Sequence, residues 1–203
     1  EGRETIASGS YSHAEGNLTI AIGFASHAEG QSSETLGISS HSEGLGNYAI
    51  GFVSHAEGIF NVATGDGSHV EGESCNTFGT LSHAEGNTTQ TFGSHSHTEG
   101  IFTTSSADFS HAEGEGTVTY GVSSHAEGYY TITYGTGSHA EGAETIASGS
   151  YSHAEGNTSY AIGESSHAEG ILTTALGIGS HTNGYSTIAS GSYQHVSGQF
   201  NTH

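Results

Sequence analysis

The chain has 203 residues, of which 33 are glycine, and it carries 21 acidic side chains against one basic side chain, Arg3. One arginine is too little positive charge to bind the phosphates of nucleic acid or an anionic membrane surface. No segment approaches the ~20 consecutive apolar residues of a transmembrane helix. Because the chain starts at Glu1 without a methionine, we expect 1–203 to be a segment of a longer, fibrous, extracellular protein.

A short motif, Ser-His-Ala-Glu-Gly, first occurs at Ser12–Gly16 and then recurs, intact or slightly varied, along the chain. Its histidine occupies every fourteenth position from His13 to His195, without insertion or deletion. A period this strict indicates that each repeat is one structural unit stacked on its neighbours. We therefore expect a single repeat domain over 1–203 with fourteen coils of 14 residues.

The columns of the repeat are numbered here from 1 to 14 on residues 19–32, which read TIAIGFASHAEGQS. Glycine fills column 5, except at Ala107, and column 12 throughout, which indicates two tight turns with positive-φ or crowded corners. The two segments of four residues between them are too short for helices and suit strands. The pattern predicts an all-β fold, a parallel β-solenoid that rises about 4.8 Å per coil.

The second strand of each coil contains the motif. Its columns 8 and 10 hold mostly serine and small residues, while column 9 is always His and column 11 is Glu in 12 of the 14 coils. Burying a row of carboxylates without basic partners would cost several kcal/mol per ion. Because side chains alternate along a strand, we expect His and Glu to face solvent and the small residues to face inward.

The first strand alternates in the same way, but its outward set is apolar. Column 3 never exceeds threonine in size, whereas columns 2 and 4, though mainly apolar, also accept Glu34, Asn76 and Gln90. We therefore place the small columns inside and the apolar columns outside, where another copy of the chain must cover them. The residues predicted at this interface include Ile20, Ile22, Tyr48, Ile50, Val118, Tyr120, Ile132, Tyr134, Tyr160 and Ile162.

The column pattern also resembles a known repeat. Tyr48-Ala49-Ile50-Gly51 followed by Ser54-His55-Ala56-Glu57-Gly58, and likewise the segment 20–30, is similar to the YadA-like head repeat of trimeric autotransporter adhesins. The resemblance implies a left-handed parallel β-roll and a homotrimer whose apolar columns meet around the threefold axis. This chain departs from the family pattern in its nearly invariant His and Glu columns, and in the coil at 103–116, which lacks the turn glycine.

The function predicted from this resemblance is that of a non-enzymatic adhesin head, displayed outside the cell and attached to its surface, which binds a host extracellular-matrix protein or a surface glycan. The alternative is a phage tail or neck fibre segment, part of a virion, with a structural and receptor-contact role. Catalysis has little support, because Ser26 and His27, like the other Ser-His pairs, are strand neighbours and point to opposite faces.

Paired large residues recur at the second turn. In one interpretation they pack against the adjacent protomer; in the other they are exposed contacts for a protein or glycan partner, since turn residues on a rigid scaffold often serve recognition. These partner-contact candidates are Ile59, Phe60, Ile101, Phe102, Tyr129, Tyr130, Ile171 and Leu172.

Stacked coils would align the histidines and glutamates as two ladders that could bind Zn, Ni or Cu ions. Because a metal site needs three or four convergent ligands and a flat row is expected to offer mostly pairs, we favour a hydrogen-bonded surface ladder without a cofactor. The metal-ligand candidates, none of them adopted as a site, are His27, Glu29, His55, Glu57, His83 and Glu85.

Three further expectations concern single features of the sequence. The ladders predict a melting temperature that changes between pH 5 and 8, but the sequence does not predict whether it rises or falls. Ice binding would require an exposed Thr or Ala array, which the inward placement of those columns argues against. Cys75 replaces a threonine or serine of column 1, and we expect it to be a small buried residue.

Overall fold

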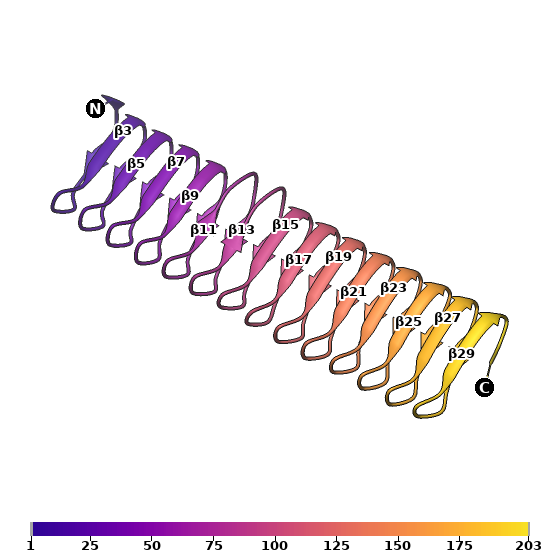
Figure 1. Cartoon of the computed structure of the whole chain (residues 1–203). Coiled ribbons are helices and arrows are strands. Elements are labelled where there is room, and N and C mark those ends of the chain that lie inside the picture. Colours follow the sequence, from indigo (N-terminus) through magenta and orange to yellow (C-terminus); the bar gives the residue numbers. More distant parts are fainter. Residues whose placement is uncertain (1, 203) are drawn as a thin grey trace. The chain divides into compact units, whose positions relative to one another are not determined.

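The structure is a computed structural model that describes residues 2–202, in which all regular elements are β-strands. By its contacts the chain divides into two compact units, residues 1–102 and 103–203. Within each unit every 14-residue repeat forms one coil that lies directly on the next, as Figure 1 shows. The predicted parallel β-solenoid is therefore confirmed.

The strands of the first unit belong to two parallel sheets. The motif strands are β1 Gly2–Arg3, β3 His13–Asn17, β5 His27–Gln31, β7 His41–Leu45, β9 His55–Ile59, β11 His69–Val70, β13 His83–Ala84 and β15 His97–Ile101. The strands of the opposite sheet are β2 Ile6–Ala7, β4 Ile20–Ala21, β6 Glu34–Thr35, β8 Tyr48–Ala49, β10 Val62–Ala63, β12 Asn76–Thr77 and β14 Gln90–Thr91.

The second unit repeats this arrangement. Its motif strands are β17 His111–Glu115, β19 His125–Tyr129, β21 His139–Ala143, β23 His153–Asn157, β25 His167–Ile171, β27 His181–Tyr185 and β29 His195–Gln199. The opposite sheet holds β16 Thr104–Ser105, β18 Val118–Thr119, β20 Ile132–Thr133, β22 Ile146–Ala147, β24 Tyr160–Ala161, β26 Thr174–Ala175 and β28 Ile188–Ala189. Pairing keeps a register of one repeat, so that His153 lies beside His167.

The strand lengths differ from the two four-residue segments that the sequence predicts. Most motif strands have five residues and continue through the column 12 glycine into column 13, whereas the opposite strands have two. The column 12 glycines permit this continuation: Gly30 has φ +97°, and a Cβ there would lie 2.2 Å from the carbonyl oxygen of Gly44. The glycine of column 12 therefore lies within the motif strand rather than at its end.

The interior of each coil is filled by small side chains, as the parity argument predicts. Thr19, Ala21 and Ala28 are fully buried, and the buried Ser26 donates a 2.8 Å hydrogen bond from its hydroxyl to the carbonyl of Gly23, which closes the first turn. Cys75 is also fully buried, as expected. Because the Thr and Ala columns face inward, they offer no array for ice.

Candidate functional surfaces

The histidines of column 9 form a stacked ladder on the outer surface of the motif sheet. The rings of His69 and His83 lie 4.8 Å apart, centroid to centroid, at an interplanar angle of 1°. His153 and His167 stack at 4.8 Å and 7°. Since the parallel pairing places equal columns side by side, the coil-to-coil spacing dictates this stacking. Together with the column 11 side chains, these histidines make up what we call the His–Glu face.

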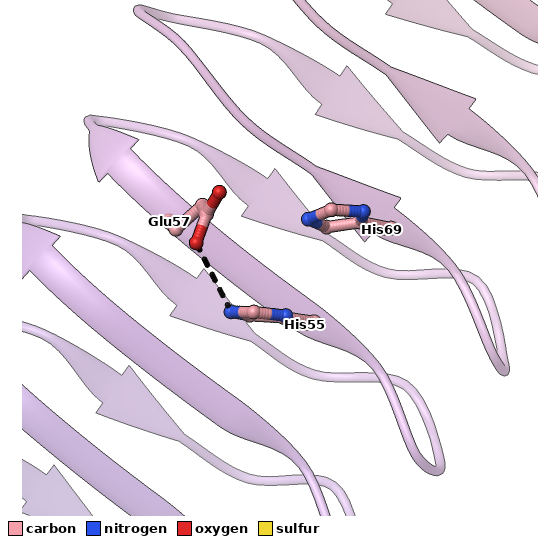
Figure 2. Close-up of side chains that lie close together, drawn as sticks. All are labelled: His55, Glu57 and His69. Atoms are coloured by element: carbon pink, nitrogen blue, oxygen red, sulfur yellow. Dashed lines mark ion pairs between the residues drawn. The ribbon is translucent and has the colours of Figure 1, made fainter.

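The glutamates of column 11 lie against imidazole rings: some contact the histidine of their own coil, some that of the next coil, and Glu113 contacts both. Figure 2 shows His55 and Glu57, whose Nε2 and Oε2 atoms are 3.6 Å apart, with His69 of the following coil beside them. In the second unit, His167 Nε2 lies 3.4 Å from Oε1 of Glu155 and 3.9 Å from Oε2 of Glu169. Imidazole nitrogens and carboxylate oxygens therefore alternate along the face.

The surroundings of the histidine ladder lower the pKa of several of its imidazole rings. Burial lowers the pKa of His55, and the neighbouring His41 and His69 lower it further, because imidazolium rings in a stack repel one another. Burial and a stacked neighbour likewise lower the pKa of His153 and His167. A lowered pKa favours the neutral imidazole, the form that can act as a metal ligand.

The glutamates interact with one another along their own ladder. Hydrogen bonding to Glu71, together with burial, raises the pKa of Glu57 to about 7, and the corresponding contacts of Glu85 and Glu155 raise theirs to about 7. The pKa of Glu71 is lowered, because it accepts hydrogen bonds from the carboxyl groups of Glu85 and Glu57. Hydrogen bonds between adjacent carboxyl groups therefore raise the pKa of one group and lower that of its neighbour, a pairing that the sequence pattern does not predict.

An open groove follows the His–Glu face beside the glutamates. In the second unit it has a volume of about 690 Å³ and is lined only by glutamates of column 11 and glycines of column 12. A shorter groove of about 400 Å³ lies in the first unit. Because the glycines have no side chains, the carboxylates line a recess instead of projecting from a flat sheet.

The structure brings together more potential ligand atoms than the sequence indicates. A ring nitrogen of His55, a ring nitrogen of His69 and a carboxylate oxygen of Glu57 all lie within 4.8 Å of one another, and His167, Glu169 and His181 form the same kind of group. Of the sequence candidates, His27 and Glu29 also belong to such a group, together with Glu15. The sequence predicts mostly pairs, because a flat row of side chains does not show that the next coil's histidine approaches the same carboxylate.

The opposite sheet exposes the apolar columns, which we call the apolar face. Ile22, Tyr48 and Ile50 keep 45%, 40% and 41% of their surface exposed, although large apolar side chains on one face of a strand usually pack into a hydrophobic core. Aromatic rings stack along this face too, for example Tyr120 on Tyr134 at 5.1 Å. Every predicted interface residue lies on it, with partial to large exposure: Ile20, Ile22, Tyr48, Ile50, Val118, Tyr120, Ile132, Tyr134, Tyr160 and Ile162.

The paired residues of the second turn are exposed within the chain. Phe60 retains 58% of its surface, and its ring covers Gly46 of the preceding coil, where a Cβ would approach the ring to 2.6 Å. Tyr129 and Tyr130 contact each other edge to face at 4.5 Å. The exposed set contains all the predicted contact residues, Ile59, Phe60, Ile101, Phe102, Tyr129, Tyr130, Ile171 and Leu172.

The comparisons with known proteins agree with this architecture. A family model described as the YadA head domain repeat matches residues 1–26, 14–33, 154–171 and 168–193. The matched segments lie in both units and consist of the 14-residue coils described above, so these coils are YadA-like head repeats, and the coils between them share the same 14-residue period. That family consists of structural, adhesin-type surface domains. A search of the curated proteins finds no match. In residues 2–202 no helix is long and apolar enough to cross a membrane.

Proposed function

We propose that the chain forms a homotrimeric adhesin head at the cell surface, in which the apolar face is covered by two further copies. The observation that carries this proposal is the row of large apolar side chains left 40–52% exposed along the sheet opposite the motif, among them Ile22, Tyr48 and Tyr120. Soluble monomers rarely expose an apolar surface of this extent. Heads of the family that the repeats identify are trimers, and the apolar columns match the interface that the resemblance implies.

The contacts to a target would come from the second turns, which lie between the two faces. The pairs Ile59–Phe60 and Tyr129–Tyr130 are exposed and supported by the hydrogen-bonded coils beneath them. Rigid, exposed aromatic and aliphatic residues are typical anchors of protein and glycan recognition. An attached, extracellular head with such turns fits an adhesin that binds a matrix protein or a surface glycan.

A binding assay tests this role. The full chain would be applied to surfaces coated with extracellular-matrix proteins and to a glycan array, beside a variant in which the four turn pairs are replaced by Ser-Thr. We expect saturable binding to at least one surface and its loss in the variant. Substitution of exposed first-turn residues, Phe24→Ser and Phe52→Ser, provides a matched control that should still bind. Absence of binding by the unmodified chain, or equal binding by the turn-pair variant, would contradict the proposal.

A further inference from the structure

Carboxylate oxygens and imidazole nitrogens face each other on the His–Glu face at a spacing that a hydrogen bond does not explain. An N–H···O hydrogen bond spans about 2.7–3.2 Å. His55 Nε2 and Glu57 Oε2 are 3.6 Å apart, and the two carboxylate contacts of His167 measure 3.4 and 3.9 Å. The Nε2 atoms of His55, His69 and His167 are buried and make no hydrogen bond.

This spacing suits two atoms that share one cation. Zinc–nitrogen and zinc–oxygen bonds of about 2.0–2.2 Å in a tetrahedral site place neighbouring ligand atoms about 3.4 Å apart. The observed His–Glu contacts of 3.4–3.9 Å are therefore close to ligand spacing, whereas the stacked rings of His55 and His69, 4.8 Å apart, must tilt toward each other to share an ion. A divalent ion between the coils would give the buried nitrogens a partner and neutralise carboxylates in a chain whose one basic residue is Arg3.

We propose that the His–Glu face binds divalent transition-metal ions of the zinc class, each held between two adjacent coils by two imidazole Nε2 atoms and one or two carboxylates. The group drawn in Figure 2, His55, Glu57 and His69, is one such site, and Glu71, on the same strand face as His69, supplies the fourth ligand. Imidazole nitrogen selects zinc, nickel or copper over calcium and magnesium, which prefer oxygen.

The repeat also sets the number of ions. If two coils contribute four ligands to one ion, neighbouring sites compete for the same histidines, and the seven coils of each unit supply about three sites. The full chain would then hold about six ions. The last two coils carry Asn183 and Ser197 in place of glutamate, so the ladder loses its carboxylates there.

The test is a measurement of bound zinc on the full chain. The protein is stripped with a chelator, dialysed against zinc chloride with excess magnesium, and analysed for metal per chain. A ladder variant replaces the column 11 glutamates of the second unit by glutamine: Glu113→Gln, Glu127→Gln, Glu141→Gln, Glu155→Gln and Glu169→Gln. A control variant removes the same charge elsewhere: Glu4→Gln, Glu34→Gln, Glu115→Gln, Glu144→Gln and Glu164→Gln.

We expect about six zinc ions on the unmodified chain, about half that number on the ladder variant, and no loss on the control variant. Equal zinc loss from both variants would show that general acidity attracts the ion, and no loss from either would show that these carboxylates are not ligands. Both results overturn the proposal. Displacement of zinc by a hundredfold excess of calcium would also overturn it, because it would leave no role for imidazole.

A second measurement does not depend on the folding of any variant. X-ray absorption at the zinc edge of the unmodified, loaded chain should show imidazole scattering and a first shell at about 2.0–2.1 Å. A first shell of oxygen alone would contradict the assignment of His55, His69 and their equivalents as ligands.

Discussion

The two broad faces of each coil differ in how much variation they accept. On the apolar face, columns 2 and 4 hold Ile, Leu, Val, Phe and Tyr, with occasional polar residues such as Glu34 and Gln90. On the His–Glu face, column 9 is histidine in every coil and column 11 is glutamate in all coils but two. Packing against another copy requires only that apolar surface be buried, and many different side chains provide such surface. A face that repeats two particular groups at fixed spacing implies a chemical requirement.

The largest expected effect comes from placing charge on the apolar face. The double substitution Ile50→Glu and Ile162→Glu puts one carboxylate on this face in each unit. If another copy covers the face, each unpaired carboxylate should cost several kcal/mol, and the assembly should dissociate or fail to fold. Sedimentation and circular dichroism would record the loss.

A matched control for that substitution lies in the first turn. Ile38→Glu and Ile178→Glu introduce the same charges at side chains that are 50% and 49% exposed, in a column that already accepts Asp66 and Glu164. This control should assemble normally. If the apolar-face variant assembles as well as the control, the apolar face is not an interface.

The His–Glu face should govern how stability depends on pH, measured with a chelator present. For His55, His153 and His167, whose pKa is lowered on folding, the unfolded chain binds the proton more tightly, so stability is lost as the pH falls below about 6.5. For Glu57 and Glu155, whose pKa is raised from 4.5 to about 7, the folded chain binds the proton more tightly, so this stability is full below about pH 4.5 and is lost as the pH rises to 7.

Because these opposed shifts act over the same range, they predict a melting temperature that changes with pH below about 7 and levels off above it. The ladder variant with five glutamines should lose the part of this change that comes from Glu155, while the control variant should keep it. A melting temperature that stays constant from pH 5 to 8 would refute the linkage between the ladder and folding.

The smallest expected effect lies in the first turn, which joins the two faces. Val53 has φ +53°, in the left-handed region that costs a β-branched residue about 1–2 kcal/mol. Val53→Gly should therefore raise the free energy of unfolding by about 1 kcal/mol, after allowance for the entropy of glycine. Chemical denaturation measures it. The same change at Val62, in the strand β10, should lower stability instead, and a loss at both positions would contradict the strain assigned to Val53.

Much of the fold could be predicted from the sequence, because one repeat is constrained by all its copies. The 14-residue period predicts the length of one coil. The absence of residues larger than threonine in column 3 predicts that Ala21 and its equivalents face the interior, as they do. The turn conformations could not be predicted in this way. Val53 adopts a left-handed conformation that its side chain disfavours, since its amide donates a 2.9 Å hydrogen bond to the carbonyl of Ile38 in the preceding coil. Contacts between coils override local preference there.

The candidate site was predictable only in part for the same reason. Alternation along the strand places His55 and Glu57 on one outer face. The approach of His69 to the same carboxylate, and the sharing of protons between Glu57 and Glu71, arise between coils that are 14 residues apart in the chain. Properties of a single repeat are visible in its sequence, whereas properties of the stack depend on the spacing at which the coils meet.

Sedimentation equilibrium of the intact chain tests the central claim, that the apolar face is an interface between copies, most directly. The proposed trimer predicts a mass of three times the 20.7 kDa of one chain, unchanged on dilution through the micromolar range. The chelator is included so that metal cannot bridge separate molecules. A folded species with the mass of a single chain would contradict both the homotrimer and the covered apolar face.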